Sequence, residues 1–214
     1  MTSLLAKNIK LDHKNHIYKL SYLPDITFSS VTEFIHQFFR KFDQEKIAKK
    51  LIKENPKYSE MTVEELIEEW SKGAKKGTIV HNELELFINE GVEPEHELAK
   101  CGLEWIKKEQ KNPDYIFYSE AIIFSKELAI AGTIDLLIYN KKTETYCLLD
   151  WKTNKRIDQK SFRKKKGVLN STAHLDDCNF SHYSLQLSFY RYILENYYGL
   201  KIDNQSIFHL KRND

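Results

Sequence analysis

The sequence predicts an α/β fold in which an N-terminal helical layer packs on a mixed central sheet. Three segments with strand character, residues 115–124, 129–139 and 145–152, follow one another in the second half of the chain. Helical periodicity precedes them and returns at residues 183–197, before a further strand at residues 206–210. An antiparallel meander with flanking helices, and a last strand reached through a helix, is typical of a mixed sheet.

Length and composition set the outer limits of this prediction. The 214 residues, of which 41% are hydrophobic and 30% charged, suit one domain with a sizeable core. We expect an N-terminal helical part to about residue 75 and a core from about residue 76 to residue 214. The net charge of +2 excludes a general polycation, so any nucleic-acid surface must come from local clusters.

The compartment follows from what the sequence lacks. No apolar run approaches the ~20 residues of a membrane span, so we expect no membrane partner. The amino-terminal residues lack the apolar core of a secretion signal. The three cysteines, Cys101, Cys147 and Cys178, are odd in number and far apart. We therefore expect reduced thiols and a cytoplasmic protein.

The N-terminal part is expected to contain one short strand and then helices. Residues 17–20 predict a short strand or edge segment. Ser29 or Ser30 is a suitable N-cap for a helix that begins near Val31. Aromatic and aliphatic residues then recur at helical spacing as far as Phe42, which predicts an amphipathic helix that packs on the core.

Two more helices and a turn complete this part. Thr62 opens a helix with an acidic first turn, and Gly73 and Gly77 are expected to interrupt it. A separate helix follows from about residue 78 to residue 90, where His81 and Glu85 lie on one face because they are four residues apart. Residues 94–110 read as the next helix, with a proline at its first position.

The strands at 129–139 and 145–152 carry an unusual set of charges. A short polar connection makes them an antiparallel hairpin, which can bring Asp135 beside Asp150. Asp150 and Lys152 share one face of their strand, and Trp151 lies on the other. Charges among apolar residues are unfavourable unless they are paired or bind a metal. Two carboxylates and a lysine would thus meet at one edge of an otherwise apolar pair of strands.

This arrangement has two interpretations. The first is a salt bridge on a strand face, which Asp-x-Lys alone would favour. The second is a site for a hard divalent cation such as Mg2+, which prefers carboxylate oxygens and can activate water beside a phosphoryl group. Lys152 could then position the water or neutralise charge on the phosphate. The second aspartate, Asp135, on the preceding strand shifts the balance toward a site.

Four short motifs in one order resemble the PD-(D/E)XK nuclease superfamily and, within it, the RecB-like exonuclease branch. They are Gly77-x-x-x-His81-x-x-x-Glu85, the segment GTIDLL at residues 132–137, Asp-Trp-Lys-Thr at residues 150–153, and Gln186-x-x-x-Tyr190. The literal Pro-Asp pair is absent, because Asp135 follows Ile134, but RecB-like members commonly show Gly-x-x-Asp there. The resemblance implies a restriction-endonuclease-like αβββαβ core with added N-terminal helices.

The resemblance also implies roles for the residues of these motifs. His81, Asp135 and Asp150 would bind the metal, with the backbone carbonyl of Trp151 as a further ligand, and Lys152 would act on the water. The imidazole makes Mn2+ a candidate beside Mg2+. Glu85, Gln186 and Tyr190 would support the site. Glu120 would either bind the metal through water or orient a basic side chain.

The segment after the third strand is the most basic part of the chain. It carries Lys155, Arg156, Arg163, Lys164, Lys165 and Lys166. It is either a solvated loop or a surface that follows the phosphates of a nucleic acid, and its place beside the predicted site favours the second. Nothing resembles a base-reading helix, so we expect binding that is independent of sequence.

Other metal sites receive less support. His174, Cys178 and His182 have a spacing that could hold zinc on a helix face, but the neighbouring Asp176 and Asp177 suggest a loop, and no fourth ligand is apparent. The RecB-like proteins that hold an iron–sulfur cluster use four cysteines, one of them before the histidine motif. Here no cysteine precedes His81, so we expect no iron–sulfur cluster.

The sequence therefore predicts a Mg2+- or Mn2+-dependent deoxyribonuclease. The RecB-like motifs favour an exonuclease that acts on single-stranded DNA or duplex ends, with a role in repair or recombination. An endonuclease of the same fold, a non-catalytic DNA-binding module and a zinc-stabilised interaction protein are the alternatives. The intact set of Asp135, Asp150 and Lys152 argues against a pure binding module.

Overall fold

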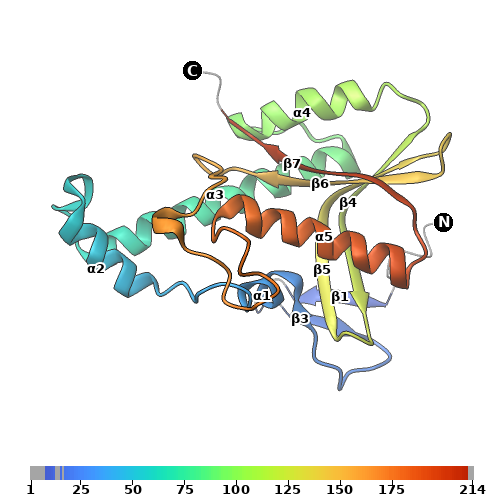
Figure 1. Cartoon of the computed structure of the whole chain (residues 1–214). Helices are drawn as coiled ribbons and strands as arrows, with labels where there is room; N and C mark the ends of the chain where they lie inside the picture. Colours follow the sequence, from blue (N-terminus) through green and yellow to red (C-terminus); the bar gives the residue numbers. More distant parts are fainter. Residues whose placement is uncertain (1–7, 13–14, 16, 212–214) are drawn as a thin grey trace.

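The computed structural model describes residues 8–12, 15 and 17–211 of the chain, and a mixed sheet forms its centre (Figure 1). Strands β4 (Tyr115–Ser125), β5 (Ile130–Asn140) and β6 (Thr145–Lys152) form an antiparallel meander. Strand β7 (Ile202–His209) joins β6 in parallel, and the short β3 (Ser29–Ser30) joins the start of β5 in parallel. The predicted mixed sheet and meander are confirmed.

Within the described residues, five α-helices and two short 3-10 helices surround the sheet. They are α1 (Val31–His36), α2 (Gln44–Glu54), η1 (Pro56–Tyr58), α3 (Val63–Glu90), α4 (Glu97–Glu109), η2 (Phe162–Lys164) and α5 (Asn179–Tyr197). A separate two-stranded sheet pairs β1 (Ile9–Asp12) with β2 (Ile17–Leu20), which is the strand expected at residues 17–20. Among the described residues, no helix combines the length and apolar character that crossing a lipid bilayer requires.

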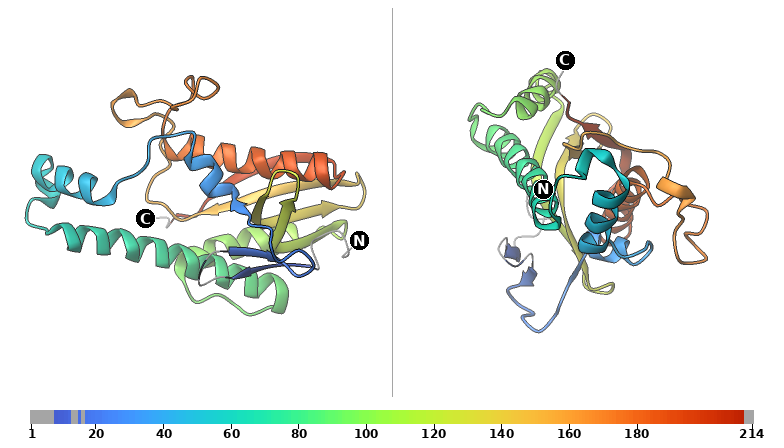
Figure 2. Two further views of the ribbon diagram at one scale, coloured as in Figure 1. Left: turned by 90° about the horizontal axis from the view of Figure 1, so that it is seen from below. Right: turned by 90° about the vertical axis from the view of Figure 1, so that its left-hand side faces the viewer.

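The core lies on both faces of the sheet, and different helices cover each face (Figure 2). On one face, α1 and α5 pack through residues such as Ile35 and Ile193 against Leu148. On the other, α3 and α4 pack through residues such as Leu84 against Leu149. The order α3, β4, β5, β6, α5, β7 is the expected αβββαβ core, with α4 inserted after its first helix.

Helix α3 corrects the predicted break at Gly73 and Gly77. The helix runs unbroken over 28 residues, from a capping box at Thr62 to Gly91, which ends it in the left-handed conformation. A glycine inside a helix costs only about 1 kcal/mol relative to alanine, so two strong caps and a packed face outweigh both. Gly77 also faces the segment after β6, where a Cβ would lie 3.2 Å from Thr153 Oγ1.

The helix predicted from Val31 to about Phe42 is also corrected, because it ends at His36. Its start is as expected, with Ser30 forming a capping box. Beyond His36 the aromatic side chains leave the helical spacing: Phe38 stacks on Phe189, and Phe39 stacks on His182. Asp43 then caps α2, a helix that the sequence analysis did not separate.

The remaining boundaries differ by a few residues. Helix α4 starts at Glu97 with His96 as its cap, so Pro94 precedes the helix and does not occupy its first position. Helix α5 starts four residues earlier than predicted, at Asn179. Gly199 has φ +65°, which is the left-handed conformation expected at a helix end. All three cysteines are free thiols.

Candidate metal centre

Asp135 lies where β5 loses its pairing with both neighbouring strands. The β4 ladder pairs Ile134 and Leu136 but makes no pair at Asp135, and the β6 ladder begins only at Leu136. This gap frees the Asp135 carboxylate to accept a hydrogen bond from the Trp151 backbone N–H, at 2.8 Å. The register of the hairpin, extended by one position, places Asp135 opposite Asp150.

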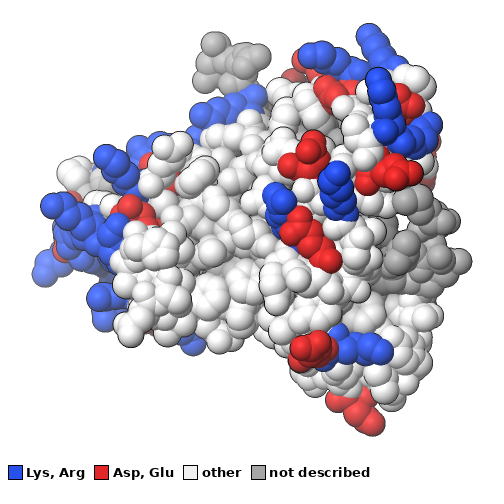
Figure 3. Space-filling model, turned by 45° about the vertical axis from the view of Figure 1, so that its right-hand side comes forward, with Lys and Arg blue, Asp and Glu red and all other residues white. Residues whose placement is uncertain are grey.

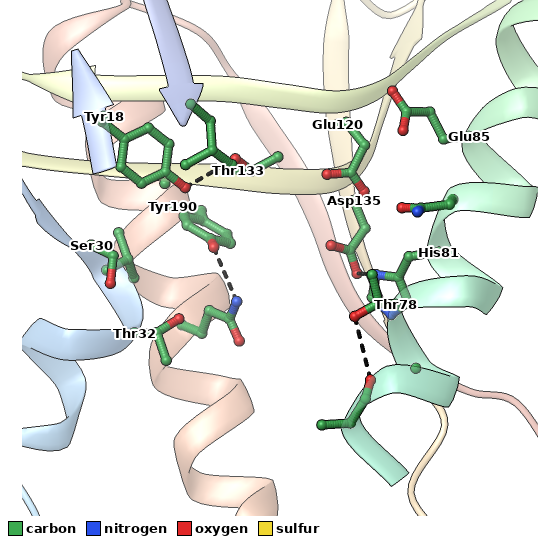
Figure 4. Close-up of a pocket in the computed structure, with 17 residues that line it drawn as sticks. Tyr18, Ser30, Thr32, Thr78, His81, Glu85, Glu120, Thr133, Asp135 and Tyr190 are labelled. Carbon is green, nitrogen blue, oxygen red and sulfur yellow. Dashed lines mark hydrogen bonds and ion pairs between the residues drawn. The ribbon is translucent and has the colours of Figure 1, made fainter. Parts of the chain in front are cut away.

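Glu120 occupies the matching gap in β4 and has an unusual backbone. Its φ of +47° is in the left-handed region, which is uncommon for a residue with a side chain. Such a conformation costs on the order of 1–3 kcal/mol and persists where the surroundings enforce it, often at functional sites. Glu120 thus leaves the ladder at the level of Asp135. The two carboxylates face the same space (Figure 4).

His81 completes a group of three potential metal ligands. It projects from α3 toward β5, and its Nδ1 lies 3.5 Å from Asp135 Oδ2. Each of the residues His81, Glu120 and Asp135 offers one ligand atom, and these three atoms lie within 4.8 Å of one another. No other such group occurs among the residues that the structure describes. Glu85 lies one turn further along α3 and lines the same cleft, without joining this group.

Asp150 and Lys152 form a buried ion pair beside this group. Lys152 Nζ lies 2.5 Å from Asp150 Oδ2, and the two side chains are 15% and 3% exposed. The ammonium also lies over the ring of Tyr183, 4.6 Å from its centroid. Apart from Lys152, no described group donates a hydrogen bond to Asp150 Oδ2. The buried Asp150 carboxylate oxygen is thus held by the Lys152 ammonium alone.

The acids of this site repel one another, and their pKa values separate. Burial, followed by repulsion from Asp135, raises the pKa of Glu120 to about 8 and that of Asp150 to about 7. Burial would also raise the pKa of Asp135, but attraction to His81 and Lys152 and the Trp151 N–H lower it below its ordinary value. Asp135 in turn raises the pKa of His81 against the effect of burial.

These residues fit a hard divalent cation. The group offers one imidazole nitrogen and two carboxylates. Asp150, which the sequence predicts as a further ligand, is not one of its members, and its carboxylate is paired with Lys152. Oxygen donors suit Mg2+ and Mn2+, and a positive ion would offset the burial and the mutual repulsion that raise the pKa values of Glu120 and Asp150. We find no basic side chain paired with Glu120 within the described part of the chain, so the geometry favours the metal role over the orienting role.

Cation binding to the isolated protein is expected to tighten as pH rises from about 6 to about 8.5. A cation must displace protons from Glu120 and Asp150, so its apparent Kd should fall by about tenfold per pH unit for each proton released. Without metal, the raised pKa of Glu120 makes unfolding easier as pH rises from about 4.5 through 8.

Calorimetric titration with Mn2+ at several pH values measures this effect. Thermal melts should show a larger stabilisation by Mn2+ at pH about 8.5 than at pH about 6. The Glu120→Gln variant, which has no proton to displace at that position, should show a shallower dependence. A Kd that does not change with pH would contradict the placement of the cation among these acids.

A cleft of about 520 Å³ lies in front of the metal group (Figure 4). Gln186 and Tyr190 of α5 line its opposite wall, and the Gln186 amide donates a hydrogen bond to the Tyr190 hydroxyl at 3.0 Å. The Tyr190 ring is buried against Gly132, where an added Cβ would lie 2.5 Å from Tyr190 Cε1. The glycine of the GTIDLL motif is therefore required by the close approach of this ring.

The basic segment after β6 divides into paired and unpaired residues. Arg156, Arg163 and Lys166 form ion pairs with acids of the protein itself. Lys155, Lys164 and Lys165 make no ion pair with any described residue, and Lys155 lines, together with Thr153, a cleft next to that of the metal group. In Figure 3, Lys and Arg side chains gather at the left and again at the upper right, whereas the middle of this face has few charges.

The spacing of His174, Cys178 and His182 does not produce a ligand group. His182 bonds to Asp177 at 3.0 Å and stacks on Phe39. Cys178 is buried at the start of α5 with its thiol near Ser181. Helix α5 begins only after Cys178, so the three residues do not share one helix face, and within the described residues they do not meet as the metal group does.

Tyr183 is the residue at this site that the sequence analysis missed. It contacts Lys152 with its ring and donates a hydrogen bond from its hydroxyl to Asn154 Oδ1, at 2.7 Å. Helical spacing could have identified it, because Tyr183, Gln186 and Tyr190 are three and four residues apart and lie on one face of α5.

Comparison with known proteins agrees with this arrangement. The family model of the PD-(D/E)XK nuclease superfamily matches residues 18–210. That range includes every residue of the metal group, the ion pair and the opposite wall of the cleft. No curated protein matches the chain.

Proposed function

The chain belongs to the PD-(D/E)XK nuclease superfamily, which implies a metal-dependent nuclease acting on DNA, and we propose that it is a Mg2+- or Mn2+-dependent exonuclease. The observation that carries this proposal is the meeting of His81, Glu120 and Asp135 beside the buried Asp150–Lys152 pair. A binding protein has no need of several mutually repelling acids at the back of a cleft.

We assign the roles as follows. His81, Glu120, Asp135 and Asp150 hold the cation, with the backbone carbonyl of Trp151 as a further donor. A divalent cation there supplies Lewis acidity and lowers the pKa of water. Lys152, held by Asp150 and by the Tyr183 ring, orients the attacking water and balances negative charge that develops on the phosphoryl oxygens.

Other residues position the substrate and the ligands. Glu85 adds negative charge behind the metal group, and Gln186 and Tyr190 present polar atoms to the strand from the opposite wall. Lys155, Lys164 and Lys165 contact phosphates directly, whereas Arg156, Arg163 and Lys166 would exchange their present carboxylate partners for phosphates. Contacts to phosphate carry no base sequence, so we propose binding that is independent of sequence.

The RecB-like motif order supports action on ends or single strands. Incubation with Mg2+ or Mn2+ should degrade linear single-stranded DNA to short products, while a circular single strand of the same sequence stays intact. Cleavage of the circle at the rate of the linear strand would instead indicate an endonuclease of the same fold. Cleavage of neither, in a preparation that binds the metal, would contradict the nuclease proposal. Blocking the 5′ or 3′ end of the linear strand then gives the polarity.

A further inference from the structure

A second cleft lies next to the first along α3. It has a volume of about 600 Å³ and lies between α3, η1 and the segment that follows β6. Ala74 and Gly77 line both this cleft and the one that contains His81. The two clefts are therefore neighbours along one helix, and a polymer that occupies the first can extend into the second.

Aromatic rings form the walls of the second cleft. Trp70 and Tyr58 line it, both of them half-buried. Trp70 is supported from the side by Phe42, at 5.8 Å between centroids, and Phe42 is itself 59% exposed. The other two tryptophans, Trp105 and Trp151, pack against each other in the core. Trp70 alone among the tryptophans thus offers ring surface to a cleft.

The floor and rim of the cleft suit a polyanion. Gly73 leaves the floor open, because a Cβ there would meet no atom within 4 Å, whereas Gly77 lies against Thr153. Lys76 and Lys155 are exposed at the rim, against one acid, Glu69. Open space beside aromatic rings and lysines is the combination by which proteins hold single-stranded nucleic acid.

We propose that this second cleft is a base-stacking subsite for single-stranded DNA, in which a base stacks on Trp70 while Lys76 and Lys155 contact the adjoining phosphates. The proposal rests on the proposed nuclease function, since it concerns the same strand. His81 follows Trp70 by eleven residues on α3, roughly 16 Å along the helix axis, which a few nucleotides span. Every base has a stacking face, so the subsite tolerates any sequence.

Binding measured in EDTA tests the subsite without any cleavage. The probes are a 12-nucleotide oligothymidylate and a 12-unit strand of abasic sites, which has the same phosphates and no bases. The oligothymidylate should quench the fluorescence of the wild type, and the abasic strand should not. Trp70→Ala should weaken oligothymidylate binding by about tenfold to 100-fold and leave the weak binding of the abasic strand unchanged.

Two further variants keep the test decisive. Tyr192→Ala removes an exposed ring on α5 outside both clefts and should bind the oligothymidylate like the wild type. Trp70→Phe preserves a ring at the site, so it should retain affinity within a few-fold and lose the quenching, even if the alanine variant fails to fold.

Three outcomes would overturn the subsite: absence of oligothymidylate binding, unchanged affinity in Trp70→Ala, or equal weakening toward the abasic strand. Failure of the nuclease proposal is a separate result. In that case the wild type would bind the oligothymidylate through Trp70 but would not cleave it when Mg2+ or Mn2+ is added.

Discussion

The Asp135→Asn variant is expected to lose DNA cleavage by at least about 100-fold and to lose Mn2+ binding, while it stays folded. Asp135 is the acid that links the parts of the site, because its carboxylate contacts His81 and accepts the Trp151 N–H. The asparagine carbonyl can still accept that hydrogen bond, so the local backbone is preserved. It has no negative charge, and removing one electrostatic contribution of this kind typically costs 100-fold or more in rate.

Cleavage of an end-labelled single strand, Mn2+ titration and a thermal melt measure the three parts of this prediction. Asp203→Asn is the matched control, because Asp203 is an exposed acid of β7 that lines neither cleft. Its variant should behave like the wild type in all three. Cleavage by Asp135→Asn at the wild-type rate would show that Asp135 has no part in the mechanism. Loss of the cooperative thermal transition would show that Asp135 is needed for folding instead.

The Lys152→Met variant is expected to lose cleavage to a similar extent but to keep the cation. Methionine retains most of the length of the side chain and its packing on Tyr183, and lacks only the ammonium. Asp150 would then lose its partner, but burial already raises its pKa to about 7, so a proton can neutralise it in the metal-free protein. We therefore expect the fold to survive. As the pH is lowered, the variant should lose the cation at a higher pH than the wild type does.

Single-turnover cleavage at saturating Mn2+ separates this effect from metal loss. Lys142→Met, in the exposed turn at the far end of the same hairpin, is the control and should cleave normally. A Lys152→Met enzyme with the wild-type single-turnover rate would show that the ammonium serves only to neutralise Asp150. Loss of Mn2+ binding together with cleavage would point to a structural role in assembling the acids.

The strands of the sheet could be predicted from the sequence more completely than the site could. Runs of apolar, β-branched and aromatic residues between turn residues predicted β4, β5 and β6 within a residue or two, because a strand that is buried on both faces is apolar along most of its length. Capping residues such as Ser30 and Thr62 predicted the helix starts for the same local reason. The hairpin then brought Asp135 opposite Asp150 through register alone.

Features that depend on distant contacts were not predictable from the chain. Gly73 and Gly77 suggested a turn, because a glycine lowers helix stability at its own position. The caps that compensate for this loss, at Thr62 and Gly91, lie more than ten residues away. Phe38 and Phe39 fit a helical period, but their partners are on α5. The left-handed conformation of Glu120, which brings it into the metal group, arises only once β4 pairs with β5 around the gap at Asp135.

The most direct test is one Mn2+ titration of the wild-type protein with two readouts in the same samples. Electron paramagnetic resonance measures the bound metal, and a linear single strand of DNA reports cleavage. Cleavage should be absent in EDTA and should rise in proportion to the occupied site. Full cleavage in EDTA, or a saturated site without any cleavage, would contradict the hydrolytic role of the acids around Asp135.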